Sequence, residues 1–441
     1  MTNFRDPELL AKIRQQFDRC PYPKTPVETS HKNHPDFLYI HDLTTAYYLR
    51  DQKVIDTRGK KILDAGCGTG LNALGLAEAN PGAKIVGIDL SPESIEFAKM
   101  RLQYHGFNHC EFYTLSIEEL EQLDTKFDYI NCDEVLYLLS EPLVGLQAMK
   151  SVLEPEGIIR FNLHSLYGRD YMLRGQELFR KMGLMEESPG DFEVNAVRET
   201  MQALKDNIIL KQCTWQKLDK TTENIFTNFL LLGDKGFTAE EVFGLLEQAN
   251  LEFIEMVQWK TWDLLDLFKD PDNLPVLWGL SLPELSVEER LALYDLLHPI
   301  HRLLDMWCGH PGQGKNFVPV SEWQVQDWQN AIVDLHPQLR TQALKEELQH
   351  CLEQLHPFEI SRFLPESGDS IVLDSTLSAC LLLPLLTGSQ SIARLVQRWQ
   401  NLHPVHPITL SEIAPEEAWK TVSQAIASLV ESGYLLVERV E

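Results

Sequence analysis

Apolar and polar positions alternate in two ways along this chain. From Lys60 onward, short apolar runs are each followed by a longer amphipathic stretch. The apolar runs predict strands at residues 61–63, 83–89, within 110–119, 127–132, 157–164 and 251–257. Strands that alternate with helices are typical of a parallel sheet covered on both faces, so the pattern predicts an α/β domain.

The remaining segments have mainly helical spacing. Leu9, Leu10, Ile13 and Phe17 predict a helix between Asp6 and Cys20, and the residues after 370 predict three helices before an apolar, hairpin-like tail at 434–440. A breaker cluster at 269–273 indicates the end of the sheet domain. The predicted units are an N-terminal helical arm or lid (1–58), an α/β domain (59–270) with a helical insertion (about 166–222), a helical linker (271–365) and a winged-helix-like module (366–441).

Three glycines stand directly behind the first predicted strand. The order is Asp64-x-Gly66-x-Gly68-x-Gly70, and a helical stretch follows. Glycine permits a tight turn and close approach of a ligand, and the helix start offers unpaired N–H groups. A dinucleotide fingerprint places its glycines at relative positions 1, 3 and 6. Counted from Gly66, the sixth position is Leu71, so the spacing weakens a nicotinamide interpretation.

This motif resembles the first motif of class I S-adenosylmethionine-dependent methyltransferases. In that family the loop passes under the amino-acid end of the cofactor. The resemblance therefore implies a Rossmann-like sheet, S-adenosylmethionine as cofactor and S-adenosylhomocysteine as product. It implies cofactor contacts from Asp64, Gly66, Cys67, Gly68 and Gly70.

Later strand ends add further cofactor candidates. Asp89 ends the second predicted strand, 19 residues beyond Gly70, where its carboxylate can accept both ribose hydroxyls; alternatively, it caps the helix that starts at Ser91. The family usually has an Asp where this chain has Ser116, which can still bond the adenine amine but carries no charge. The other cofactor candidates are Leu90, Ile117, Cys132 and Asp133.

Polar residues beyond the fourth and fifth predicted strands are the catalytic candidates. They are Glu134, Tyr137, His164 and, if the N-terminal arm covers the cofactor, Tyr22. Either tyrosine can orient an acceptor nitrogen and His164 can carry a proton, although a strand-end histidine also commonly bonds neighbouring backbone. Tyr167 and Arg169 are candidates for an anionic part of the acceptor. The Asn-Pro-Pro-aromatic motif of many amide and base methylases is absent.

The acceptor follows only from a broader resemblance. Residues 133–137 and 164–169, the helical extension and the winged-helix-like end look like bacterial methyltransferases with a regulatory domain, some of which modify protein nitrogens, including lysine. The resemblance implies N-methylation of a lysine or amide nitrogen in a protein. Small-molecule O- or N-methylation is the alternative, and a non-catalytic cofactor-binding regulator is a third.

The charge composition of the chain limits which kinds of binding partner are expected. The 39 basic and 65 acidic residues leave a formal charge of −26, which disfavours nucleic acid and anionic membranes. The N-terminus has no apolar signal core, and the apolar run at 377–386 is too short to span a bilayer, so we expect a cytoplasmic protein.

The eight cysteines are scattered, as in proteins of reducing compartments. No metal is expected, because neither Cys308 and His310 nor His403 and His406 belong to clustered zinc spacing. Whether the chain forms a homodimer stays open.

Overall fold

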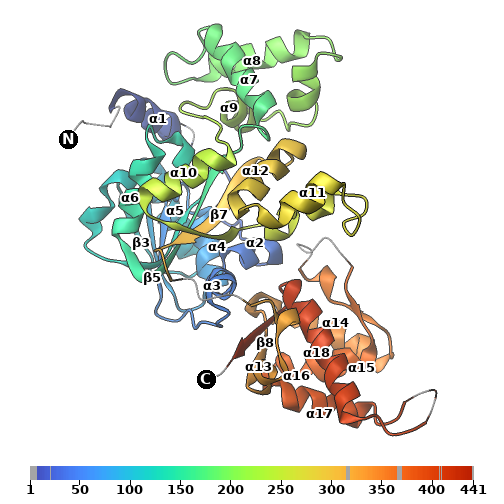
Figure 1. Ribbon diagram of the computed structural model, residues 1–441. Helices are drawn as coiled ribbons and strands as arrows, with labels where there is room; N and C mark the ends of the chain where they lie inside the picture. Colours follow the sequence, from blue (N-terminus) through green and yellow to red (C-terminus); the bar gives the residue numbers. More distant parts are fainter. Residues whose placement is uncertain are drawn as a thin grey trace. The chain divides into compact units, whose positions relative to one another are not determined.

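The computed structural model describes residues 7–19, 21–313, 318–364, 370–406, 408 and 410–439. The expectations for Met1–Asp6, Cys20 and Val440 lie outside the described residues. Contacts within the chain define two compact units (Figure 1). Unit 1 contains residues 1–30, 59–77 and 83–313, and unit 2 contains residues 31–58, 78–82 and 314–441.

Unit 1 is built on a seven-stranded sheet with the order β3-β2-β1-β4-β5-β7-β6. The strands are β1 (Lys61–Ala65), β2 (Lys84–Asp89), β3 (Glu111–Thr114), β4 (Phe127–Cys132), β5 (Leu153–His164), β6 (Glu252–Met256) and β7 (Leu303–Gly309). The first five strands pair in parallel, whereas β7 is antiparallel to both β5 and β6. The predicted Rossmann-like α/β fold is confirmed.

Helices flank this sheet (Figure 1). The α-helices are α1 (Pro7–Arg19), α4 (Leu71–Ala79), α5 (Pro92–Tyr104), α6 (Pro142–Ser151), α7 (Asp170–Lys181), α8 (Asp191–Ala203), α9 (Thr222–Phe229), α10 (Ala239–Ala249), α11 (Val276–Ser281) and α12 (Val287–Leu297). Helix α6 packs against α10 and against the 3-10 helix η1 (Ile117–Leu123). The predicted caps at Ser91 and Thr238 are both present, since each side chain accepts a hydrogen bond from the first turn of its helix.

The sheet extends beyond the domain end that we expected near residue 270. The breaker cluster at 269–273 forms turns, but α11, α12 and β7 follow it, and β7 returns to pair with β5 along its whole length. Unit 1 therefore ends at Gln313. A local breaker ends an element, and it says nothing about a later strand that joins the same sheet.

The N-terminal arm also differs from the single unit that we expected at residues 1–58. Helix α1 and residues 21–30 belong to unit 1, whereas α2 (Pro35–His41) and α3 (Leu43–Asp51) belong to unit 2. Within unit 2, the Tyr48 hydroxyl accepts a hydrogen bond from Val437 N at 2.9 Å. The Thr45 hydroxyl lies 3.0 Å from His336 Nε2.

Unit 2 contains a three-stranded antiparallel sheet. Strand β8 (Ala331–Leu335) lies between β11 (Gln390–Ser391) and β12 (Leu435–Arg439), so the C-terminal strand pairs with β8 and not within a hairpin. A second, two-stranded sheet joins β9 (Phe358–Glu359) and β10 (Val372–Leu373). The helices after residue 318 are α13 (Val325–Gln329), α14 (Gln342–Glu353), α15 (Ser375–Leu377), α16 (Leu383–Leu385), α17 (Ile392–Leu402) and α18 (Pro415–Glu431).

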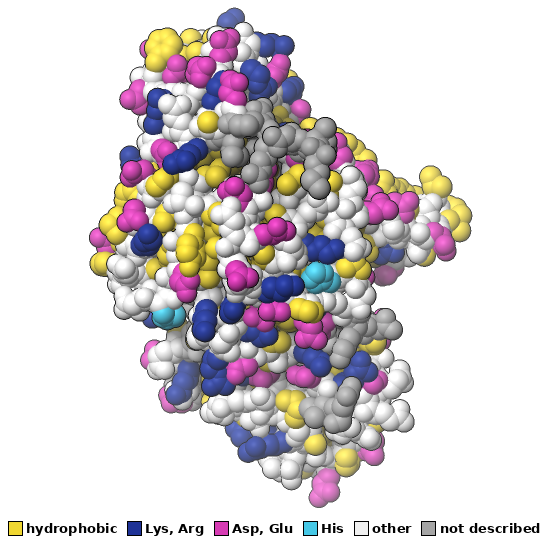
Figure 2. Space-filling view, turned by 90° about the vertical axis from the view of Figure 1, so that its left-hand side faces the viewer, with side chains coloured by type: hydrophobic (Ala, Val, Ile, Leu, Met, Phe, Trp, Pro, Cys, Tyr) yellow, Lys and Arg dark blue, Asp and Glu magenta, His cyan; other side chains and the backbone are white. Residues whose placement is uncertain are grey.

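Over the described part of the chain, no helix combines the length and the apolar character that crossing a membrane would require. Lys and Arg side chains are interspersed with Asp and Glu on the face that Figure 2 shows, and the described basic side chains form no continuous field there.

Candidate functional site

The glycine turn behind β1 is closely packed. Gly66 and Cys67 donate backbone hydrogen bonds to the Ile88 carbonyl, both at 2.8 Å, which ties the turn to β2. Gly66 and Gly68 have φ angles of 86° and 49°, in the left-handed region. A Cβ on Gly66 would lie 2.4 Å from a Val135 methyl carbon, and one on Gly68 would lie 2.3 Å from the Tyr22 carbonyl oxygen. Neither position can hold a side chain.

Residues 21–29, which we call the strap, lie against this turn. Thr69 donates from its backbone N–H to the Tyr22 carbonyl (3.0 Å) and from its hydroxyl to the Pro23 carbonyl (2.8 Å). The buried Arg101 guanidinium donates to the carbonyls of Thr69 (3.0 Å), Pro26 (2.8 Å) and Thr25 (3.0 Å). The structure thus places Tyr22 beside the glycine turn.

Two carboxylates lie close to the glycine turn, Asp64 near the end of β1 and Asp89 at the end of β2. Asp64 Oδ1 accepts from Asn131 Nδ2 at 2.9 Å, and burial raises the pKa of Asp64 to about 7. Asp89 accepts from the N–H groups of Gly68 (3.0 Å) and Ser91 (2.8 Å), and burial raises its pKa too.

The buried oxygen Asp64 Oδ2 has no hydrogen-bond partner among the described residues. A buried acceptor without a donor costs free energy unless a ligand supplies one. This oxygen and the side-chain-free turn fit the polar end of S-adenosylmethionine.

The remaining cofactor candidates lie either beside the glycine turn and its neighbouring strand ends or in the hydrophobic core. Leu90 is half-buried beside Asp89, and the Cys67 thiol is buried in the turn. Ser116 caps η1, because its hydroxyl accepts from Glu118 N at 3.4 Å. Ile117 and Cys132 are buried in the hydrophobic core of the sheet. The structure does not bring these last two to an open surface.

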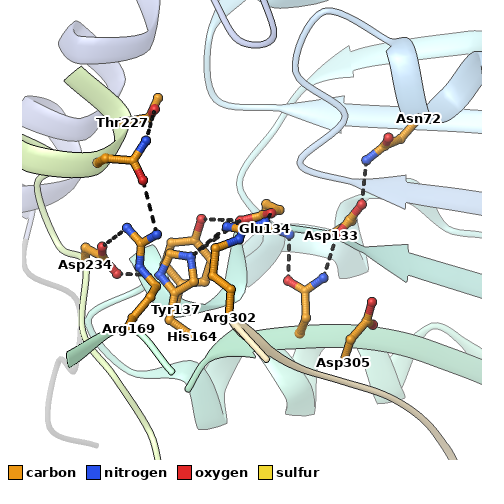
Figure 3. A network of polar contacts seen from close by, with 12 residues as sticks. Asn72, Asp133, Glu134, Tyr137, His164, Arg169, Thr227, Asp234, Arg302 and Asp305 are labelled. Atoms are coloured by element: carbon orange, nitrogen blue, oxygen red, sulfur yellow. Dashed lines mark hydrogen bonds and ion pairs between the residues drawn. The ribbon is translucent and has the colours of Figure 1, made fainter. Parts of the chain in front are cut away.

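Asp133 and Glu134 form a turn directly after β4 (Figure 3). Asp133 accepts from Asn72 Nδ2 at 2.9 Å and from Asn162 Nδ2 at 2.5 Å. The Asn162 amide oxygen accepts from Glu134 N at 2.8 Å. Glu134 has a φ of 61°, which is rare outside glycine, so the surrounding contacts impose this conformation.

The Glu134 carboxylate holds a cation. Both of its oxygens accept from the Arg302 guanidinium, with Oε2 at 2.9 Å from Nη1 (Figure 3). The Tyr137 hydroxyl donates to Oε2 at 3.0 Å. Burial opposes ionisation, but the contacts with His164 and Arg302 outweigh it and hold the pKa of Glu134 well below its usual range. Glu134 is therefore a carboxylate at neutral pH.

His164 lies between Asp234 and Arg302. Its Nδ1 is 2.6 Å from Asp234 Oδ1, and its Nε2 is 3.2 Å from Arg302 Nη1. Nε2 also lies 3.5 Å from Glu134 Oε2, so the ring stands between two carboxylates and a guanidinium. The ring is buried and stacks on Tyr137 with centroids 3.8 Å apart. Both ring nitrogens are engaged, an arrangement that positions Tyr137 and Arg302.

The two candidates for an anionic acceptor group are separated. Arg169 is buried and donates to Asp234 at 3.0 Å, whereas the Tyr167 side chain is exposed. Gln176 adds a second donor to Asp234 at 2.7 Å. Among the described residues, no group of three or more His, Cys, Asp or Glu side chains is arranged to hold a metal ion.

Several residues of this network were not predicted. They are Asn72, Asn131, Arg160, Asn162, Asp234, Arg302 and Asp305. A signal existed for those on β4 and β5, where Asn131, Arg160 and Asn162 interrupt otherwise apolar runs. Arg302 directly precedes β7, the strand that was not predicted, Asp305 lies within it, and Asp234 lies outside regular structure.

The sheet order, the glycine turn and the carboxylates of Asp64 in β1 and Asp89 at the end of β2 together define the site of a class I, S-adenosylmethionine-dependent methyltransferase. Residues 56–226 match the family model described as a methyltransferase domain. The chain thus contains a methyltransferase domain, with S-adenosylmethionine as its cofactor.

Of two relatives, one carries a methyltransferase name and one is known only by its sequence. A protein from Synechococcus is 27% identical over 317 residues, which cover 70% of this chain and 73% of that protein. A ubiquinone biosynthesis O-methyltransferase from Actinobacillus pleuropneumoniae is 35% identical over 127 residues, 28% of this chain and 53% of that enzyme, so the match spans about half of its length.

The structure of PKMT2 from Rickettsia typhi aligns with a TM-score of 0.59 at 16% identity, covering 94% of this chain and 76% of that chain. A second structure of PKMT2, in complex with AdoHcy, aligns with the same TM-score. At this identity the likeness concerns the fold.

Proposed function

We propose that the protein transfers the methyl group of S-adenosylmethionine to a nitrogen of a protein side chain, either a lysine amine or an amide. The single observation that carries this proposal is the ionised Glu134 carboxylate, which binds a cationic side chain directly behind β4. Both Glu134 oxygens bind Arg302, so in this proposal Glu134 acts by holding Arg302 and the Tyr137 hydroxyl, and that hydroxyl orients the acceptor nitrogen.

The proposed roles follow the geometry of the turn. Bound S-adenosylmethionine supplies the electrophilic methyl group. Asp64 and the turn from Gly66 to Gly70 hold its amino-acid end, and Asp89 holds its ribose. Asp133, fixed by two asparagine amides, lies between cofactor and acceptor.

Two tyrosines orient the acceptor in this proposal. Burial raises the pKa of Tyr137 well above its usual range, and partial burial followed by the Glu134 charge raises that of Tyr22. Both hydroxyls are therefore neutral and can accept a hydrogen bond from an amine. An ammonium acceptor must lose a proton before it attacks, and the protein's main task is then alignment and exclusion of water.

A small-molecule acceptor is the second candidate. The 127-residue similarity to ubiquinone biosynthesis O-methyltransferases favours it. A hydroxyl and an ammonium must each lose a proton before attack, so the engaged nitrogens of His164 do not separate the two candidates, and the labelling experiment decides.

The two candidates differ in where a labelled methyl group appears. Purified protein is incubated with radiolabelled S-adenosylmethionine and fractionated cell extract. Label in the macromolecular fraction supports protein methylation, and label in the low-molecular-weight fraction supports the small-molecule alternative. Label in neither fraction, with the cofactor bound, supports a non-catalytic regulator. Glu134→Gln should reduce labelling at least about tenfold, since a charge-assisted contact contributes roughly 1.5–3 kcal/mol, whereas Glu141→Gln, an exposed charge change, should not.

We further propose that unit 2 binds a protein partner and regulates unit 1. Helices α17 and α18 and strand β12 lie within residues 366–441, the predicted winged-helix-like module, and the resemblance to methyltransferases with a regulatory domain supports this role. The net charge of −26 favours a protein over nucleic acid as that partner.

A further inference from the structure

A row of polar side chains crosses the middle of the sheet in unit 1. Asp64 of β1 pairs in register with Asn131 of β4, which pairs in register with Arg160 of β5. Because side chains alternate between the two faces of a strand, neighbours in register lie on the same face of the sheet. All three residues are buried. Polar groups buried in this way cost free energy unless they bond to one another or to a ligand.

Hydrogen bonds join this row from one strand to the next. Arg160 Nη1 donates to Asn131 Oδ1 at 3.4 Å, and Asn131 Nδ2 donates to Asp64 Oδ1 at 2.9 Å. A guanidinium donates and never accepts, so Arg160 fixes which end of the Asn131 amide faces β5. The amide N–H then reaches Asp64 Oδ1. The other oxygen, Asp64 Oδ2, is buried and has no partner among the described residues.

Arg160 is also the cation between two further acids. Asp305 of β7 accepts from Arg160 Nε at 3.1 Å and from Nη2 at 2.7 Å. Asp133 Oδ1 lies 4.0 Å from the same Nη2. An opposite charge at this range favours the ionised form of a carboxyl group. Strand β7, which lies beyond the domain end expected from sequence, therefore contributes an acid to the surroundings of the cofactor residues.

Charged and titratable groups interact with Asp64 from the glycine turn and from three neighbouring strands. They are Cys67 in the turn, Asp89 of β2, Cys132 and Asp133 at the end of β4, and Arg160 of β5. Burial is the largest cause that raises the pKa of Asp64 to about 7; the Asn131 bond and the Arg160 charge lower it, and the two other acids raise it. Burial also raises the pKa of both thiols, so they remain neutral. Arg160 is therefore the cation that opposes the effect of burial on Asp64.

We propose that Arg160 is a positioning residue for the cofactor. It orients the Asn131 amide and favours the ionised form of Asp64, so that Asp64 Oδ2 can accept a hydrogen bond from the amino group of S-adenosylmethionine. Asp305 opposes this effect, because its carboxylate offsets the Arg160 charge. The inference rests on the proposed contact between Asp64 and the amino-acid end of the cofactor, and it is independent of the acceptor.

The pH dependence of S-adenosylhomocysteine binding tests this role. An ammonium ion binds a carboxylate better than a neutral carboxyl group, so the affinity should fall as the pH decreases through the pKa of Asp64. Asp305→Asn should move this fall to lower pH, because the Arg160 charge is no longer offset. The double variant Arg160→Gln/Asp305→Asn should move it to higher pH than in wild type, because the cation is gone. Removing both partners together leaves neither of their charges buried and unpaired, which favours folding.

Calorimetric titration from about pH 5.5 to about pH 8.5 measures these profiles. Near about pH 6 the double variant should bind about tenfold more weakly than Asp305→Asn, since a nearby cation lowers a carboxyl pKa by about one or more. Near about pH 8.5, where Asp64 is ionised in both, the two affinities should agree within about twofold. Arg174→Gln removes an exposed guanidinium from α7 and should leave the profile as in wild type.

Circular dichroism and thermal denaturation verify that each variant folds. The role of Arg160 is overturned if the affinity of the double variant falls at the same pH as in wild type or at a lower one, or does not depend on pH. It is equally overturned if Asp305→Asn does not move the fall to lower pH, or if Arg174→Gln shifts the profile as far as the double variant does. A wild-type affinity that does not vary with pH would instead overturn the Asp64 contact, and absence of any binding would overturn the cofactor assignment itself.

Discussion

Glu134 shows how a single residue of this site is constrained. A left-handed conformation at a non-glycine residue costs on the order of 1–3 kcal/mol and persists only where neighbours over-determine it. Here the Asn162 oxygen holds the Glu134 N–H while Arg302 holds its carboxylate. Strain and charge are both concentrated at the position that our proposal assigns to the acceptor.

Asp64 makes stability depend on pH. Its folded pKa of about 7 exceeds the unfolded value near 3.9, so the folded chain binds this proton more tightly. The free energy of unfolding should therefore decrease as pH rises from about 4 to about 7, by up to ~4 kcal/mol for this group. Asp64→Asn removes this loss and should gain stability relative to wild type between pH 5 and pH 8.

Urea denaturation of both proteins without cofactor measures the effect. If the difference in unfolding free energy between wild type and Asp64→Asn is the same at pH 5 and at pH 8, the raised pKa of Asp64 is contradicted.

At this scale the sequence indicated Asp64, Asp89 and the three glycines because their type and spacing are demanded by the turn itself. It did not indicate Arg302 or Asp234. These residues reach Glu134 and His164 from segments more than 60 positions away, and no local pattern records such a contact.

Among the elements, the strands with long apolar runs were predictable, and β7 was not. Its residues include Asp305, which pairs with Arg160 of β5 at 2.7 Å, so the apolar pattern is interrupted. The strap could be foreseen only as a general lid. Its anchoring depends on Arg101, a basic residue on α5 that sequence alone would place on the solvent side of an amphipathic helix.

The glycine turn allows a matched pair of substitutions. Gly68→Ala places a Cβ 2.3 Å from the Tyr22 carbonyl oxygen, whereas Gly106→Ala meets nothing within 4 Å; both residues have positive φ. Gly106→Ala should cost only about 1–2 kcal/mol of backbone strain and leave cofactor binding intact. Gly68→Ala pays a similar strain and also displaces the strap, so S-adenosylhomocysteine affinity should fall at least about tenfold (~1.4 kcal/mol). Calorimetric titration measures the S-adenosylhomocysteine affinity of both variants. Equal affinities of Gly68→Ala and Gly106→Ala would show that the strap does not shape the cofactor site.

Arg101 should control the strap from the other side. Arg101→Met removes the donors to Thr25, Pro26 and Thr69, so amide hydrogen exchange in residues 21–29 should accelerate more than elsewhere in unit 1. Lys99→Met, an exposed change on the same helix, is the control and should leave exchange there unaltered. Mass spectrometry measures this amide hydrogen exchange. Unchanged protection of residues 21–29 in Arg101→Met would contradict the anchoring of the strap by Arg101.

At the scale of the whole molecule, the main feature is the order in which segments of the chain contribute to the two units. The chain alternates between the two units, in the order 1–30, 31–58, 59–77, 78–82, 83–313 and 314–441. Helix α4 itself crosses from one unit to the other, since it runs to Ala79. Our division into consecutive domains was drawn from composition and breakers, which carry no information about such interleaving.

This interleaving predicts cooperative unfolding. Because helix α4 contains residues of both units, unfolding of one unit removes part of a helix that belongs to the other, and we expect the two to unfold together. Differential scanning calorimetry should therefore show one transition, raised as a whole by S-adenosylhomocysteine. Two separate transitions, of which the ligand shifts only one, would contradict this expectation.

The strap also has a consequence for turnover. The strap is held by hydrogen bonds from Thr69 to the Tyr22 and Pro23 carbonyls and from Arg101 to the Pro26 carbonyl. If the cofactor binds beneath it, as the lid prediction implies, cofactor exchange requires these bonds to break together. We therefore expect the spent nucleoside to leave slowly, so that its departure sets the pace of successive cycles and an initial burst precedes the steady rate.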